Sequence, residues 1–323
     1  MAHGAGGKAT LTLVEGLLAP AFGIATLEDA AFVDGYAVTT DSYVVKPIRF
    51  PGGSIGELAV NGTVNDLAVA GAKPLAITLS LVLEEGLPAE TLRAEVEAIA
   101  NAAAAAGVAV VGGDTKVVER GKCDSMYVTT TGIGQRDARA SLSSTSLRPG
   151  DRILLSGPVG AHGTAIMVAR GEFELDAEIE SDTRSLWPLV DAVLEAAGPS
   201  LRAMRDATRG GVASVLNELA RSSGAAIVVR EGAVPVDPPV AGACEILGID
   251  PMYVANEGVL VVFVAPDAVG DALAAIRSVR GCERAVGIGE VGAEPAGMVL
   301  LQTAFGGRRV MDLLVGDPLP RIC

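Results

Sequence analysis

Residues 75–83 read LAITLSLVL, residues 90–106 read ETLRAEVEAIANAAAAA and residues 108–111 read VAVV. The first segment is apolar and short, which predicts a β-strand. The second is Ala-rich with charges on one face, which predicts a helix. The third predicts a buried strand that ends at Gly112-Gly113-Asp114. A strand, a helix and a strand in direct succession indicate a mixed α/β unit.

Similar patterns continue on both sides of this unit. Ser54 is expected to cap a helix that runs to Ala70. Other predicted helices cover residues 10–18, 161–170, 186–197, 210–222 and 268–279, and other predicted strands cover residues 37–45, 127–134, 152–156, 226–230, 258–265, 285–291 and 298–302. Because Ser, Arg, Pro and Gly cluster at residues 141–151, a domain boundary is expected there. Both halves mix strands and helices, so the predicted fold class is α/β of the α+β type, in two domains.

Length and charge limit the possible functions. The 323 residues are enough for two domains with cores of their own. The formal net charge is −14, which argues against nucleic acid as the main partner, since that needs clustered Lys and Arg. An acidic chain can still bind a nucleotide when metal ions bridge its carboxylates to the phosphates.

The cysteines and histidines do not form a metal-binding pattern. Cys123, Cys244, Cys282 and Cys323 contain no CxxC pair, and the chain has two histidines. This composition argues against a closed structural zinc site. The chain shows no segment resembling a signal peptide and no apolar run of membrane-spanning length. A cytoplasmic protein with reduced thiols is therefore expected.

Four aspartates are predicted to lie at the ends of elements. They are Asp41, Asp66, Asp114 and Asp206. Carboxylate oxygens are ligands that Mg²⁺ prefers, and glycine-rich turns leave backbone N–H groups free for phosphate. Taken singly, each aspartate could instead be a turn or N-cap residue, and Asp206 could cap the helix that follows it. The glycine-rich segment 4–8 does not have P-loop spacing.

The last residue, Cys323, follows two prolines in the segment Gly316–Cys323. Proline favours an extended backbone that rises about 3.1 Å per residue, so this segment could reach roughly 20 Å. Such an arm could carry a thiol between sites. Chain ends are usually mobile, so a frayed end with an incidental thiol is the alternative.

Seven motifs in order resemble the HypE family of hydrogenase-maturation carbamoyl dehydratases, within the aminoimidazole-ribotide-synthetase-like superfamily. They are His3–Lys8, Asp34–Ser42, Asn61–Leu67, Gly112–Lys116, Asp206–Gly211, Asn256–Gly258 and Pro320–Cys323. The resemblance covers essentially the whole chain. Its C-terminal motif is the specific part, because the aspartate and glycine motifs are shared across the superfamily.

The resemblance implies an activity, a fold and partners. ATP would be used to dehydrate an S-carbamoyl group on Cys323 to a thiocyanate, which supplies the cyanide ligand for the iron of [NiFe]-hydrogenase. Residues 1–140 would be an ATP-binding and dimerisation domain, residues 150–315 a C-terminal α/β domain, and residues 316–323 a flexible tail. A HypF-like carbamoyltransferase would load Cys323, HypC/HypD-like iron-scaffold proteins would accept the cyanide, and the protein would be a homodimer.

The resemblance also implies roles for single residues. Asp41, Asp66 and Asp206 would bind Mg²⁺, Glu257 would be the base, and Lys116 would contact the carbamoyl oxygen or the γ-phosphate. The residues implied to bind ATP are Gly6, Gly7, Lys8, Asn65, Asp114, Thr115, Arg209 and Gly210.

Two other functions fit parts of the sequence. Within the superfamily, selenophosphate synthetase is the nearest enzyme, but it carries a reactive Cys or selenocysteine near its N-terminus, and here no cysteine precedes Cys123. The chain could also be a non-catalytic carrier that presents a group on Cys323. Intact aspartates at each matching motif argue against the carrier.

Overall fold

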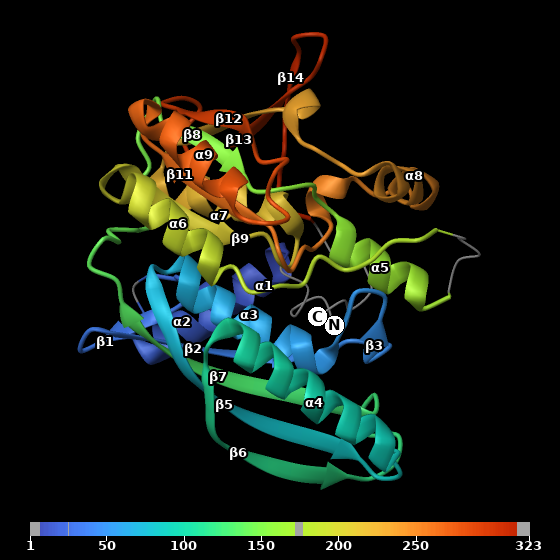
Figure 1. Ribbon diagram of the computed structural model, residues 1–323. Helices are drawn as coiled ribbons and strands as arrows, with labels where there is room; N and C mark the ends of the chain where they lie inside the picture. The colour runs from blue at the N-terminus through green and yellow to red at the C-terminus, as the bar shows by residue number, and fades with distance from the viewer. Residues whose placement is uncertain (1–6, 25, 172–176, 315–323) are drawn as a thin grey trace.

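The computed structural model describes residues 7–24, 26–171 and 177–314 (Figure 1). Two mixed sheets form two halves of the chain. The first has the strand order β1 (Ala31–Val33), β2 (Tyr36–Tyr43), β7 (Met126–Arg136), β5 (Ala72–Glu84) and β6 (Ala109–Val118). The predicted α+β class, with strands and helices in both halves, is confirmed.

Two helices cover one face of the first sheet. They are α3 (Ile55–Val69) and α4 (Ala89–Ala106), which pack on each other and on the sheet (Figure 1). Gly132 of β7 faces α3 so closely that a Cβ there would lie 2.7 Å from Thr63. Side chains alternate along a strand, so the residues between those that face α3 and α4 point to the opposite face of the sheet. This face is called here the outer face.

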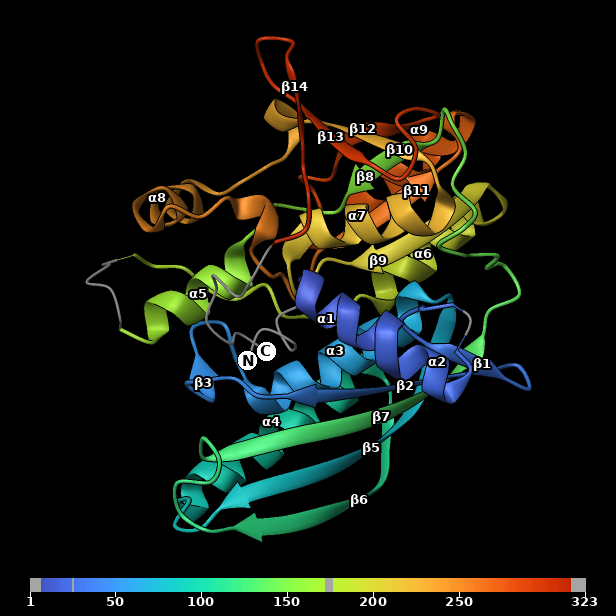
Figure 2. The same ribbon diagram turned by 180° about the vertical axis from the view of Figure 1, so that it is seen from behind.

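Several short segments precede this unit or lie beside it. Figure 2 shows α1 (Lys8–Leu13) and α2 (Ala19–Phe22) on the side of the molecule where β2 lies, and a π-helical segment, Val14–Leu18, joins them. The short strands β3 (Arg49–Phe50) and β4 (Gly53–Ser54) form a hairpin just before α3.

The second sheet is larger and has helices on both faces. Its strand order is β14 (Arg308–Val310), β13 (Val299–Gln302), β10 (Ala226–Arg230), β12 (Val286–Gly292), β8 (Arg152–Leu155), β11 (Leu260–Val264) and β9 (Leu201–Asp206). Helices α6 (Trp187–Ala197) and α9 (Val269–Ser278) pack on one face, and α7 (Gly211–Ser223) packs on the other. Helices α5 (Ala161–Ala169) and α8 (Pro238–Leu247) lie together beside this sheet, and single 3-10 turns occupy Gly198–Ser200, Glu231–Ala233, Pro251–Tyr253 and Pro266–Ala268.

The two halves meet where α3 lies against β9 and α6. Ala68 and Val69, at the end of α3, are buried in the same cluster as Leu201 and Met204 of β9. Burial of this apolar surface holds the end of β9 close to α3, so that aspartates from both halves come together.

Most predicted elements are confirmed, but some expectations were wrong. The strand at residues 108–111 is not buried and does not end at Gly112; β6 continues to Val118 and is exposed along its length, because it is the edge strand of its sheet. As a result Asp114 lies inside β6, not at its end. Asp41 and Asp66 also lie inside elements, within β2 and α3. Strands β1, β9 and β14 and helix α8 were not predicted, since they are short or interrupted by charges and prolines.

The start of α3 also differs in its chemistry from the prediction. Ser54 is at the N-cap position, but its side chain makes no capping hydrogen bond. Instead, Glu95 of α4 accepts a hydrogen bond from the backbone N–H of Gly56 at 3.0 Å, and Arg49 pairs with the same carboxylate at 2.7 Å. A carboxylate from another helix thus satisfies a donor of the first turn.

Candidate functional site

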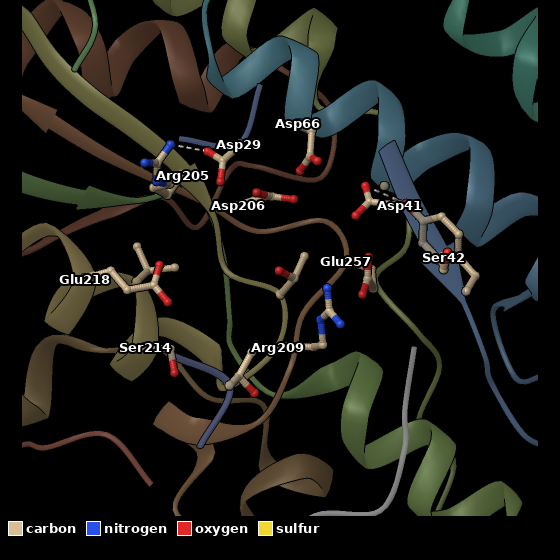
Figure 3. Close-up of a pocket in the computed structure, with 15 residues that line it drawn as sticks. Asp29, Asp41, Ser42, Asp66, Arg205, Asp206, Arg209, Ser214, Glu218 and Glu257 are labelled. Atoms are coloured by element: carbon tan, nitrogen blue, oxygen red, sulfur yellow. Dashed lines mark hydrogen bonds and ion pairs between the residues drawn. The ribbon is translucent and has the colours of Figure 1, made fainter. Parts of the chain in front are cut away.

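A cavity of about 300 Å³ lies between the two halves (Figure 3). Its walls come from α1, the segment before β1, β2, α3, the end of β9, α7 and the segment before β11. The charged residues that line it are Asp29, Asp41, Asp66, Arg205, Asp206, Arg209, Glu218 and Glu257. The fold therefore brings together five residues singled out from the sequence, which are Asp41, Asp66, Asp206, Arg209 and Glu257.

Three carboxylates in this cavity are close enough to share one cation. One oxygen from each of Asp29, Asp66 and Asp206 lies within 4.8 Å of the others. Within the described chain, Asp206 Oδ2 is buried and has no hydrogen-bond partner. An acceptor of this kind needs a partner, and converging carboxylate oxygens are typical of sites for hard divalent cations. The donor set therefore fits Mg²⁺.

The pKa values of this cluster are raised. Burial, followed by the charge of Asp29, raises the pKa of Asp206 to about 8 from its ordinary 3.8. Burial also raises the pKa of Asp66 well above its ordinary value, and Asp41 and Asp206 add to the effect. Crowded, buried carboxylates resist simultaneous ionisation, so without a cation the cluster retains protons near neutral pH.

Asp41 lines the cavity from β2 but lies outside the closest triad. The hydroxyl of Tyr43 donates to Asp41 Oδ2 at 3.4 Å, and the hydroxyl of Thr39 donates to Asp66 Oδ2 at 2.8 Å. The third member of the triad, Asp29, was missed from the sequence. Its signal is the acidic pair Glu28-Asp29 directly before the short apolar strand β1.

Glu257 is only 2% exposed, and its backbone is fixed by hydrogen bonds to Asp182. The N–H groups of Glu257 and Gly258 donate to the two carboxylate oxygens of Asp182, at 3.1 and 3.0 Å. Burial raises the pKa of Glu257 well above its ordinary value, Asp206 and Asp182 add to this, and Arg209 opposes it. A buried carboxyl group with a raised pKa is a stronger base than an exposed one, which suits it to accept a proton.

Helix α7 forms another wall of the cavity, and its start depends on two glycines. Gly210 and Gly211 both have positive φ values, 75° and 62°. A Cβ on Gly211 would lie 2.5 Å from the carbonyl oxygen of Met252, so no other residue fits without a backbone shift. Gly210, not Asp206, occupies the N-cap position, so the alternative that Asp206 caps this helix is wrong.

Glu218 of α7 is a second cavity residue that sequence reasoning missed. Burial, followed by the charge of Asp29, raises its pKa to about 7, against the opposing effect of Arg205. Its only sequence signal is the i, i+4 spacing from Ser214, which also lines the cavity.

The other sequence-predicted residues lie elsewhere. Asn65 is fully buried, donates to the carbonyl of Arg184 at 3.0 Å and accepts from the N–H of Leu186 at 2.7 Å, so it joins the two halves. Lys8 pairs with Asp312 at 2.6 Å, and its backbone N–H donates to Leu314 at 3.2 Å. Gly7 lies at the start of α1, beside a neighbouring cavity. Gly6 and Cys323 are outside the described residues.

Asp114 and Lys116 lie on the outer face of the first sheet, where they pair at 2.8 Å. Asp114 stands in register with Ser80, Thr129 and Ser42, and Ser42 lines the cavity. Three strand spacings separate Asp114 from Ser42, which corresponds to about 14 Å. Thr115 points to the other face. Lys116 therefore does not reach the cavity of its own protomer.

The three cysteines in the described chain, Cys123, Cys244 and Cys282, are all buried. Burial raises the pKa of each thiol. Buried thiols with raised pKa values are poor nucleophiles.

Comparisons with known proteins find relatives of this chain both in sequence and in fold. The chain matches the family "AIR synthase related protein, N-terminal domain" over residues 27–135 and "AIR synthase related protein, C-terminal domain" over residues 148–301. It is 48% identical over 332 residues to "Carbamoyl dehydratase HypE" of Rhodobacter capsulatus, covering 100% of this chain and 97% of that protein.

Two solved structures are also similar along nearly their whole length. "Crystal structure of HypE-HypF complex" has a chain with a TM-score of 0.90 and 43% identity, covering 94% of this chain and 99% of that chain. "Crystal Structure of Hydrogenase Maturation Protein HypE in complex with ATP" has a TM-score of 0.86 and 42% identity, covering 99% and 98%. In the described part of the present chain, no helix is long and apolar enough to cross a membrane.

Proposed function

Because the chain belongs to the HypE family of carbamoyl dehydratases, we propose that it uses ATP to dehydrate a carbamoyl group on the thiol of Cys323. The product is a thiocyanate, which supplies the cyanide ligand for the iron of [NiFe]-hydrogenase. The observation that carries this proposal is the convergence of Asp29, Asp66 and Asp206 in one cavity with Glu257 and Arg209. ATP is the proposed co-substrate, as in the related structure solved with ATP.

The reaction balances as two steps. The amide oxygen of the S-carbamoyl group attacks the γ-phosphorus of ATP, ADP leaves, and one N–H proton passes to Glu257. The C–O bond to phosphate then breaks, the second N–H proton leaves with the phosphate, and a C≡N bond remains on sulfur. Phosphorylation is needed because an amide oxygen by itself is a poor leaving group.

The residues of the cavity divide this work. Asp29, Asp66 and Asp206 would hold Mg²⁺, with Asp41 beside them; a bound Mg²⁺ would neutralise charge on the phosphates. Arg209 lines the same cavity and would supply a further positive charge to the phosphates. The buried position of Glu257 would keep bulk water away from the base.

Cation binding should depend on pH in a defined direction. The folded cluster holds protons up to about pH 8 at Asp206, whereas an unfolded aspartate loses its proton near 3.8. The folded state thus binds more protons between these values, so the stability of the cation-free protein falls as pH rises through this window. Mg²⁺ displaces the proton of Asp206, so its apparent affinity should rise by about tenfold per pH unit below pH 8 for each proton displaced.

This is measured as the increase in melting temperature on adding Mg²⁺ at pH 6, 7 and 8, with Na⁺ at equal ionic strength as the control. We expect the increase to grow with pH. The same increase at pH 6 and pH 8 would contradict a cation site at these raised-pKa carboxylates.

A homodimer is proposed to complete the nucleotide site. Asp114 and Lys116 lie on the outer face of the N-terminal sheet, away from their own cavity. Pairing of two outer faces would bring this pair from one protomer toward Ser42 and the cavity of the other. In this proposal residues 1–140 are the ATP-binding and dimerisation domain, residues 150–315 the second domain and residues 316–323 the tail.

Substitution of Ile133 tests the dimer. Ile133 is 39% exposed on the outer face, opposite Val38 and Ala76. Ile133→Glu would bury two like charges across a two-fold axis, which costs several kcal/mol and weakens association on the order of a thousandfold. Sedimentation velocity should show a monomer for this variant and a dimer for Val96→Glu, a matched change at an exposed position on α4. If Ile133→Glu is a dimer as well as Val96→Glu, the outer face is not the dimer interface.

Partners follow from the relatives. A structure of a relative in complex with HypF supports loading of Cys323 by a HypF-like carbamoyltransferase. HypC/HypD-like iron-scaffold proteins are the proposed acceptors of cyanide.

The experiment that tests the function is intact-mass analysis of the full chain after carbamoyl loading and then ATP addition. Cys323 should first gain the mass of a carbamoyl group and then lose the mass of one water. Modification of Cys123, Cys244 or Cys282, or no loss of water, would overturn the proposal. Loading without loss of water would instead support the non-catalytic carrier.

A further inference from the structure

Asp29 differs from the other two carboxylates of the cluster in how it is held. Asp66 lies within α3 and Asp206 ends β9, so the backbone of each is fixed by a regular element. Asp29 lies in the segment before β1 and belongs to no helix or strand. Ligands must be held closely to productive geometry, so the carboxylate of Asp29 needs support from other side chains.

Arg205 supplies that support. Its Nη1 donates to Asp29 Oδ2 (Figure 3). Its Nη2 donates to Glu28 Oε2, so one guanidinium binds two consecutive carboxylates. Arg205 is 8% exposed and directly precedes Asp206 in β9. The planar fork of arginine fixes the direction of both contacts, which a lysine cannot do.

Glu28 is fixed in turn from the segment that joins the two halves. Its Oε1 accepts the N–H of Ser144 at 3.0 Å and the hydroxyl of Ser144 at 2.7 Å. A chain of contacts therefore runs from Ser144 through Glu28 and Arg205 to Asp29. It joins three segments that are distant in sequence, and it ends on a carboxylate of the cluster.

The charges agree with this geometry. Burial lowers the pKa of Arg205, but Asp29 and Glu28 raise it by more, so the guanidinium stays charged. Arg205 also opposes the effect of burial on the pKa of Asp29. A permanent positive charge beside the cluster thus compensates part of its negative charge without occupying the space between the three carboxylates.

We propose that Arg205 and Glu28 are positioning residues that hold Asp29 at the cation site and couple that site to the segment between the domains. The inference rests on the proposed function, because that function requires a cation at this cluster. Arg205 lines the cavity but its guanidinium is bound by Glu28 and Asp29, and Glu28 does not line that cavity. Outer residues that orient ligating carboxylates typically change metal affinity by about 10- to 100-fold when replaced.

The test is Mn²⁺ binding to the full chain without nucleotide, measured as free Mn²⁺ by electron paramagnetic resonance. Arg205→Lys keeps the positive charge but cannot bind both carboxylates, so its dissociation constant should rise by about tenfold. Arg139→Lys is the matched control. Arg139 also binds several carboxylates, Asp137, Asp191 and Glu195, but none of the cluster. The Mn²⁺ affinity of Arg139→Lys should therefore stay within about twofold of that of the unchanged chain.

A second variant keeps the inference testable if Arg205→Lys does not fold. In Glu28→Gln, the single amide oxygen can accept from Arg205 or from Ser144, not from both, so Mn²⁺ affinity should fall by a smaller factor, about threefold to tenfold. Thermal melting without Mn²⁺ distinguishes a purely structural role from a positioning role. A purely structural role would lower the melting temperature and leave the Mn²⁺ affinity unchanged. Unchanged affinity in the folded variants overturns this inference alone. Absence of Mn²⁺ binding by the unchanged chain overturns the cation site and this inference with it.

Discussion

Asp66→Asn is expected to reduce ATP turnover by roughly 10²–10³-fold, since a cation site supplies several kcal/mol of charge stabilisation and each 1.36 kcal/mol is a factor of ten. Asparagine keeps the shape of the side chain and can still accept the hydroxyl of Thr39, which donates to Asp66 at 2.8 Å. What is lost is one negative charge in the triad with Asp29 and Asp206. The fold should therefore persist while the cation is bound weakly.

Steady-state ADP release and Mn²⁺ binding measure this effect. Asp124→Asn is a suitable control, because Asp124 pairs with Lys46 at 3.0 Å on the surface and lies outside the cavity. Loss of ADP release together with loss of Mn²⁺ binding supports the enzyme. Unchanged ADP release in Asp66→Asn would favour the non-catalytic carrier and count against the dehydratase.

Replacement of Cys323 by alanine should abolish product formation completely. The proposed reaction forms a thiocyanate on this sulfur, and the three thiols of the described chain are buried with raised pKa values. A buried thiol is a poor nucleophile, so none of the three should substitute for the terminal one.

Intact-mass analysis after carbamoyl loading is the measurement, with ATP binding by calorimetry as the control. Cys323→Ala should bind ATP with unchanged affinity, since Asp29, Asp66 and Asp206, the proposed cation ligands, all lie far from Cys323 in the sequence and are unchanged in this variant. Cys282→Ala, at a buried thiol in contact with Arg184, should still be loaded and dehydrated. Carbamoyl loading of Cys323→Ala at another cysteine would remove the basis for the tail as substrate carrier.

The type and order of most elements were predictable from the sequence. The helix at residues 90–106 and the strand at residues 226–230 form where their patterns indicate, because apolar periodicity and local propensity act over a few residues. The motifs also indicated the family, because their order along the chain is a property of the sequence itself. Five of the predicted site residues do line the cavity.

Only the tertiary structure decided which carboxylates meet. Asp29, Asp66 and Asp206 converge because burial of α3 against β9 brings the two halves together, and no local pattern records that packing. In the same packing Asn65 joins the halves. The sheet order places Lys116 on the edge strand, three strands from β2 and the cavity. Sequence spacing determines neighbours within one element, whereas contacts between elements depend on how apolar surfaces pack across the whole chain.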